Sequence, residues 1–243
     1  VTWVETDAIG VFGKQTKNAK FQSTGVGASV KFVGEMFTQD EPDLAYYPYN
    51  ESASLDGNTL HFTLPSEYTY TGESNAPMLG VKQEDDSFAF KHLCGLLKVT
   101  INNMPENAKR LFVVSESTDE RETPFITGDV VVNDVRGDKA TLSISKNGSD
   151  EVSIDLKGVE AQETYTFYIP IPVGRYPKLS VKLEMNDGVV YLDKSLSNVK
   201  IERAKMLDMP IIDVAEEIKG ITAVVNGKVD IEKIEGLKIT TII

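Results

Sequence analysis

Few side chains in this chain are of the kinds that carry out catalysis. It has two histidines, His61 and His92, and one cysteine, Cys94. Alternation predicts His61 on the solvent side of a strand, whereas His92 lies in an apolar segment and is expected to have a structural role. A Ser-His-Asp arrangement stays open, because its members meet only in the fold, but no G-x-S-x-G, phosphate loop, dinucleotide fingerprint or H-E-x-x-H occurs. We therefore predict a protein that is not an enzyme and needs no cofactor or metal.

A group of tyrosines is the first candidate binding site. Tyr46, Tyr47 and Tyr49 are close in sequence, and aromatic faces offer an apolar surface with a polar rim on which sugars can stack. The alternative, which we favour, is that alternating tyrosines pack one ring inward and place the next at a sheet edge.

A charged tripeptide is the second candidate. Arg136, Gly137 and Asp138 spell the sequence that host integrins recognise, in an expected hairpin loop between 130–132 and 141–142. The alternative, again favoured, is that Gly137 makes the turn while its charged neighbours keep the loop soluble. The acidic clusters 84–86 and 119–120 lack the spacing of a calcium loop, so we interpret them as solvated loops.

The overall charge excludes some partners. The net charge of −12 and the isoelectric point of about 4.7 repel phosphate backbones and anionic lipid, so we expect no nucleic-acid partner. No stretch approaches the roughly 20 apolar residues of a membrane helix, and no transmembrane segment is expected. The sequence begins at Val1 without the basic and apolar segments of an export signal, so we expect that any leader has been removed.

Short alternating runs dominate the chain and predict half-buried strands. The clearest runs are 60–64, 97–101, 142–144, 152–156, 165–169 and 181–185. The turn-forming pairs Asp56-Gly57, Asn147-Gly148, Asp187-Gly188 and Asn226-Gly227 tolerate positive φ, and they predict antiparallel hairpins. Strands at this spacing without helices indicate an all-β fold of the sandwich or barrel type.

A polar stretch, Gln83–Ser87, is the expected boundary between two domains. The first domain would comprise residues 1–87 and the second residues 88–243. His92, Leu97, Val99 and Ile101 are then expected on the first strand of the second domain. The polar stretch 115–123 is an alternative boundary.

Several segments resemble the fimbrillin family, the subunits of type V pili. The strongest is Phe88-Ala89-Phe90-Lys91-His92-Leu93-Cys94-Gly95-Leu96-Leu97-Lys98-Val99, and others are 7–12, 45–49, 125–129 and 168–174. The resemblance implies two tandem transthyretin-like antiparallel β-sandwich domains, export as a lipoprotein and display on the outer surface or fimbrium of a Gram-negative bacterium. In the pilus-forming relatives a first strand is removed, often after an arginine. The earliest arginine here is Arg110, so no such cleavage site can be carried over.

The C-terminal tail is the candidate donor strand. Leu237, Ile239 and Thr241 share one face, and the run ends at Ile243. An apolar terminal strand must pair with something, either its own second domain or the groove of a neighbouring subunit. Both alternatives stay open.

The leading hypothesis is a structural and adhesive surface subunit whose partners are other pilus subunits, bound by donor-strand exchange, and surface receptors or glycans. The alternative is a glycan-binding module built on Tyr46, Tyr47 and Tyr49.

Overall fold

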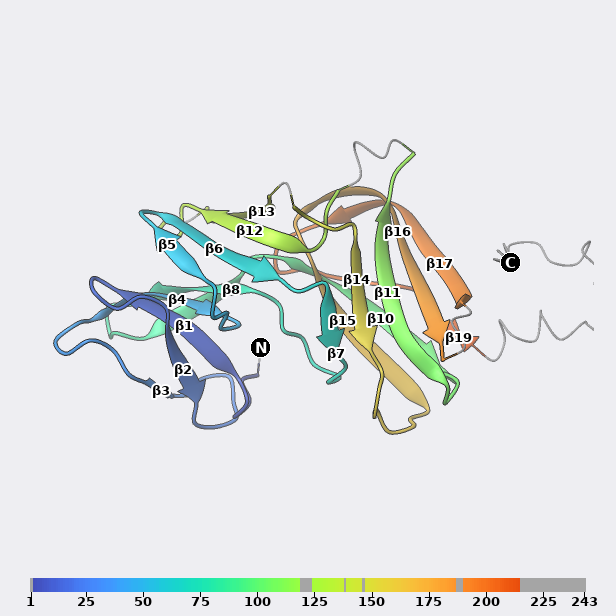
Figure 1. The fold of residues 1–243 in the computed structure, drawn as a ribbon, viewed down its shortest axis with the longest axis horizontal. Coiled ribbons are helices and arrows are strands. Elements are labelled where there is room, and N and C mark those ends of the chain that lie inside the picture. Colours follow the sequence, from blue (N-terminus) through green and yellow to red (C-terminus); the bar gives the residue numbers. More distant parts are fainter. Residues whose placement is uncertain (1, 119–123, 138, 146, 187–189, 215–243) are drawn as a thin grey trace, which may run out of the picture.

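The computed structural model describes residues 2–118, 124–137, 139–145, 147–186 and 190–214, and every regular element in these ranges that is long enough to name is a β-strand. The strands are arranged as two β-sandwich-like lobes placed side by side (Figure 1). The all-β fold predicted from the sequence is confirmed. No helix among the described residues has the length and apolar character needed to cross a membrane.

The first lobe consists of a six-stranded sheet packed on a four-stranded sheet. The larger sheet has the order β3-β2-β1-β4-β8-β9. Its strands are β1 (Ala8–Gly13), β2 (Ala19–Ser23), β3 (Phe32–Gly34), β4 (Pro42–Tyr47), β8 (Met78–Lys82) and β9 (Phe88–His92). The smaller sheet has the order β13-β12-β6-β5. Its strands are β5 (Ser54–Asp56), β6 (Thr59–Leu64), β12 (Gly128–Asn133) and β13 (Thr141–Ile144).

The second lobe packs a five-stranded sheet, β17-β16-β11-β14-β7, on a smaller sheet, β15-β10-β18, in which β19 also pairs with β10. The strands of the larger sheet are β7 (Glu67–Thr69), β11 (Ala108–Glu116), β14 (Glu151–Asp155), β16 (Gly174–Met185) and β17 (Val190–Ile201). Those of the smaller sheet are β10 (Gly95–Asn102), β15 (Thr164–Ile171), β18 (Met206–Asp208) and β19 (Ile212–Asp213).

Each lobe has its own apolar core, filled by the inward side chains of the alternating runs. Leu60, Phe62 and Leu64 are buried in the first lobe, while His61 between them is partly exposed. Leu97 and Ile101 on β10 are completely buried in the second. The period-two pattern of the sequence is therefore confirmed as the pattern of burial.

The two lobes exchange strands along the chain. After β6 in the first lobe, the chain enters the second, where β7 pairs in parallel with β14, and then returns as β8. After β11 in the second lobe, the chain enters the first, where β12 pairs with β6, and returns as β14. Each lobe thus contains strands from both halves of the chain.

This exchange differs from the expected division at residue 87. The stretch Gln83–Ser87 is the turn of the β8–β9 hairpin, in which Lys82 pairs with Phe88 and the Gln83 N–H donates to the Ser87 carbonyl oxygen at 2.8 Å. A cut after residue 87 would divide the six-stranded sheet. Turns and linkers share the same polar composition, and for this reason the pattern did not distinguish them.

The strand expected to run from His92 to Ile101 is likewise two strands. β9 ends at His92 in the first lobe, and β10 begins at Gly95 in the second.

The turn-forming pairs were confirmed only in part. Asp56-Gly57 makes the β5–β6 hairpin, with Gly57 at a φ of 56°, whereas Asn147-Gly148 joins strands of different lobes. Asp187-Gly188 and Asn226-Gly227 lie outside the described residues.

Candidate functional site

The structure does not bring the three candidate tyrosines onto one exposed surface. Tyr46 and Tyr47 are consecutive residues of β4, so their rings point to opposite faces of the sheet. Tyr46 lies in the core of the first lobe, 6.1 Å from the Phe62 ring, and is 1% exposed. Tyr47 packs on the outer face, 5.2 Å from the Trp3 ring. The candidate platform is therefore two buried rings and a half-buried Tyr49 in the structure.

Hydrogen bonds fix both buried rings. The Tyr46 hydroxyl donates to Asn18 Oδ1 at 2.7 Å, and burial raises the pKa of Tyr46 to about 12. The Tyr47 hydroxyl donates to Asp7 Oδ1 at 2.8 Å, and burial raises its pKa further. Gly10 makes room for Tyr46, because a Cβ there would stand 2.0 Å from the ring. These contacts are those of packed structural residues.

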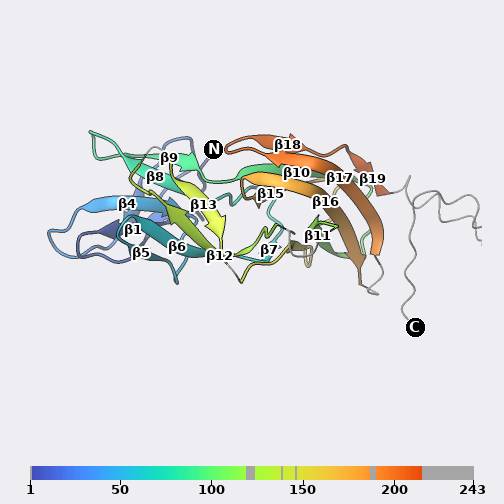
Figure 2. The same ribbon diagram turned by 90° about the horizontal axis from the view of Figure 1, so that it is seen from above.

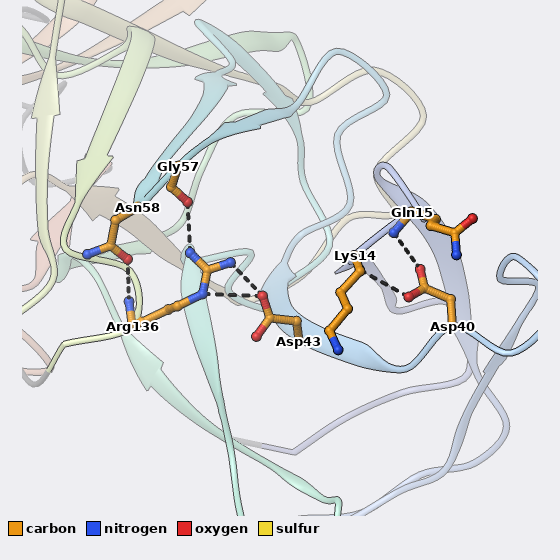
Figure 3. Close-up of polar contacts among 7 residues, drawn as sticks. All are labelled: Lys14, Gln15, Asp40, Asp43, Gly57, Asn58 and Arg136. Atoms are coloured by element: carbon orange, nitrogen blue, oxygen red, sulfur yellow. Dashed lines mark hydrogen bonds and ion pairs between the residues drawn. The ribbon is translucent and has the colours of Figure 1, made fainter.

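The arginine of the integrin-like tripeptide is used within the molecule. Arg136 follows β12, and its Nη2 and Nε lie 2.5 and 3.2 Å from Asp43 Oδ2 (Figure 3). Its Nη1 donates to the Gly57 carbonyl oxygen at 2.7 Å. Arg136 thus ties the end of the smaller sheet to β4 in the larger one. Gly137 lies in the turn, where a Cβ would contact the Asp134 carboxylate, and Asp138 lies outside the described residues.

A second carboxylate organises the same end of the first lobe. Asp40 accepts hydrogen bonds from the backbone N–H groups of Lys14 and Gln15 (Figure 3). It also accepts one from the backbone N–H of Thr16 at 2.6 Å. The Thr16 N–H is the main cause that lowers the pKa of Asp40 to about 2. Asp40 therefore holds together loops that are distant in sequence.

A cleft with a volume of about 580 Å³ lies between the lobes. One wall comes from the first lobe and includes Trp3, Met78 and His92. The opposite wall comes from the second lobe and includes Tyr168 and Met206. Figure 2 shows β9 and β18, which carry residues of the two walls, on the same side of the molecule. The cleft exists because two lobes meet there.

The outer face of the smaller second-lobe sheet supplies one wall of the cleft. In this sheet Leu97 pairs with Ile169 and with Leu207, and these side chains point towards the core. The alternate residues therefore point outward into the cleft. They are Leu96, Tyr168 and Met206, of which Leu96 and Met206 are direct partners in the register.

Arg203 joins the two lobes close to the cleft. It precedes β18, and its Nε donates to the His92 carbonyl oxygen while its Nη1 donates to the Ala140 carbonyl oxygen at 2.9 Å. Both acceptors belong to segments of the first lobe. Gly95 allows two segments of the chain to approach each other, since a Cβ there would stand 2.6 Å from the Glu202 carbonyl oxygen.

The cleft holds few charges. Burial, with a contribution from Arg203, lowers the pKa of His92, so its imidazole is neutral at pH 7. Burial raises the pKa of Cys94 to about 12, so its thiol is protonated and unreactive. The Nζ of Lys205 is 3.1 Å from the Glu202 carboxylate. Within the described ranges, no three His, Cys, Asp or Glu side chains gather closely enough to hold a metal ion.

The sequence reasoning missed the residues of the cleft. Tyr168 and Met206 lie on strands far apart in sequence, and neither belongs to a motif. Only the alternation around Tyr168 signalled that its ring faces outward. The candidate donor strand, Leu237, Ile239, Thr241 and Ile243, lies outside the described residues.

Comparison with known proteins adds no assignment. No family model matches the chain, and no curated protein matches it at a significant level.

Proposed function

We propose that this chain is a structural or adhesive subunit of a Gram-negative bacterial surface, similar to the fimbrillins, that associates with other subunits by strand addition and has no catalytic activity. The proposal joins the resemblance of segments such as 88–99 to the all-β character of the fold. Strand addition suits such a fold, because main-chain hydrogen bonds give affinity and alternate side chains give specificity.

The observation that carries the proposal is the way in which the second lobe is closed. The edge of β10 is covered by the last described part of the chain, which pairs in parallel through two short strands, β18 and β19. Their segment places Met209, Ile212 and Val214 in the core. A separate, short edge segment that completes a core is the arrangement that strand addition from another subunit would reproduce.

The tail provides the donor in this proposal. Leu237, Ile239 and Thr241 would enter the pockets of a neighbouring subunit, and Ile243 would end the strand. The alternative is that the tail is an edge strand of its own second lobe.

Deletion of 237–243 separates the two roles. If the tail is a donor, multimers seen by size-exclusion chromatography with light scattering disappear while the monomer keeps its melting temperature. A same-length control, Leu237→Asp with Ile239→Asp, should also abolish multimers. Multimers that persist while the monomer melts at a lower temperature would show that the tail is a structural strand, and the donor proposal would fail.

The platform alternative receives no support at its original place, because Tyr46 and Tyr47 are buried. Adhesion through the tripeptide is likewise not favoured, because Arg136 is bound to Asp43.

A further inference from the structure

The cleft between the lobes has the size of a small-molecule site. Its volume of about 580 Å³ lies within the range of roughly 300–1,000 Å³ that such sites occupy. It combines an apolar wall with a small number of polar side chains, which is the usual composition of a ligand site.

The apolar wall offers a ring and two flexible side chains. Tyr168 and Leu96 are half-buried on the outer face of the sheet, and the side chain of Met206 is 50% exposed. The register pairs Leu96 with Met206, and Tyr168 lies on the other side of β10, opposite Lys98. A half-buried tyrosine ring beside aliphatic groups can pack against the C–H face of a sugar ring.

Three of the polar side chains that line the cleft are not engaged elsewhere in the described part of the chain. Among the described residues, the Glu73 carboxylate and the Tyr168 hydroxyl have no hydrogen-bond or ion-pair partner. The imidazole of His92 has no hydrogen-bond partner there either, and it is neutral at pH 7. A carboxylate, a phenol and a neutral imidazole can together accept from and donate to hydroxyl groups.

The charges argue against an anionic ligand. Glu73 is negative, and Lys205 is already paired with Glu202. The guanidinium of Arg203 donates to two main-chain carbonyl oxygens. The whole chain carries a net charge of −12. Phosphorylated, sulfated or sialylated ligands would therefore be repelled.

The backbone argues against an added peptide strand. At the cleft, the His92 carbonyl oxygen accepts from Arg203, and the Leu96 N–H donates to the Lys205 carbonyl oxygen at 2.9 Å. These main-chain groups have partners already, so strand addition has little to gain there.

We infer that the cleft between the lobes binds a neutral mono- or disaccharide, with Tyr168 as the stacking ring and Glu73 as an acceptor for sugar hydroxyls. This inference goes beyond the proposed strand addition and does not depend on it, because the site lies within one chain.

The test uses the full chain as a monomer and four neutral disaccharides: lactose, maltose, mannobiose and N,N′-diacetylchitobiose. Saturation-transfer NMR and calorimetric titration should detect binding of at least one of them. 3′-Sialyllactose, which carries one further sugar, a negatively charged sialic acid, on lactose, is the anionic comparison and should bind more weakly than lactose. Binding to none of the four, or tighter binding of sialyllactose than of lactose, would overturn the inference.

Variants assign the site. Tyr168→Ala should weaken binding about tenfold, while Tyr168→Phe, which keeps the ring, should lose less. Glu73→Gln, on an exposed segment, should weaken binding about threefold. Tyr49→Ala is the matched control, because it removes another half-buried tyrosine outside the cleft, and it should have no effect.

A folded Tyr168→Ala variant that keeps full affinity, or a Tyr49→Ala variant that loses it, would place the site elsewhere. If Tyr168→Ala fails to fold, the affinity of Met206→Ala tests the cleft instead, since the Met206 side chain is exposed and lines the same wall. An unchanged affinity in that variant would count against the cleft.

Discussion

The guanidinium of Arg203 donates through Nε to the main-chain carbonyl oxygen of His92, and so joins the second lobe to the first. A further bond from Nη1 to the Ala140 carbonyl oxygen reaches a second segment of the first lobe. A lysine could not make this pair of bonds, because it lacks the planar fork of donors. Arg203 thus links the two lobes through hydrogen bonds.

Replacement of Arg203 by alanine should lower the free energy of unfolding by about 2 kcal/mol, because it removes charged hydrogen bonds to two carbonyl groups that are partly buried. Urea unfolding followed by circular dichroism measures the change. Arg175→Ala is the control, since Arg175 is an exposed arginine of the same lobe without a partner among the described residues. Equal effects of the two variants would contradict the assigned role.

The pair of Arg136 and Asp43 should show a measurable coupling. Each side chain is close to half exposed, so solvent screens the attraction, but the guanidinium places two nitrogens on one carboxylate oxygen. A double-mutant cycle of Arg136→Ala and Asp43→Ala should give a coupling energy of about 0.5–1 kcal/mol. No coupling would mean that the two residues do not hold the sheets together.

The loop capped by Asp40 should weaken in acid. Hydrogen bonds from Thr16, Gln15 and Lys14 lower the pKa of Asp40 to about 2, below its usual 3.8. A carboxyl group with a lowered pKa in the folded state stabilises the fold when the pH is above the usual pKa of 3.8. This stabilisation is lost as the pH falls through the folded-state pKa. Asp40→Asn should therefore lower the melting temperature at pH 7, and the difference from the wild type should narrow between about pH 4 and pH 2.

The control for this prediction is Glu41→Gln, which changes the neighbouring exposed carboxylate. It should leave the melting temperature nearly unchanged across the same range. If the difference in melting temperature between Asp40→Asn and the wild type stays constant down to pH 2, the ionised Asp40 carboxylate is not its cause.

The exchange of strands should make the two lobes unfold together. Leu60 and Leu111 are completely buried, one in each core. Leu60→Ala and Leu111→Ala should each lower the free energy of unfolding by about 2–5 kcal/mol. In differential scanning calorimetry each variant should shift the same single transition. Two transitions, with each variant shifting only one of them, would show that the lobes unfold independently despite the exchange.

The strands themselves could be predicted from the sequence, because burial on one face imposes a period of two. Leu97, Val99 and Ile101 show this clearly, since all three are completely buried and the residues between them are not. The pairing of the strands could not be predicted. Nothing in the residues of β7 indicates that it joins β14 rather than a first-lobe strand, because short runs carry little information on their partners.

The candidate site could not be predicted for a related reason. Tyr46 and Tyr47 were conspicuous as neighbours in sequence, yet neighbours on a strand face opposite sides. Tyr168 and Met206 come onto one sheet face only because β15 and β18 both pair with β10, and Glu73 lies on the segment that connects β7 to β8. Arg136 was noted for the tripeptide it begins, whereas its partner Asp43 lies far away in the sequence and carries no signal.

The pairing of β6 with β12 has a consequence for the time at which each lobe can form. Gly128 of β12 lies opposite Leu64 of β6, so the smaller sheet of the first lobe is incomplete until the ribosome has added the residues of β12 and β13. At about 5–20 residues per second, the N-terminal half would wait several seconds for these strands. During this interval Leu60 and Phe62 lack their cover, so the unfinished chain exposes apolar surface of the kind that makes a folding intermediate prone to aggregate.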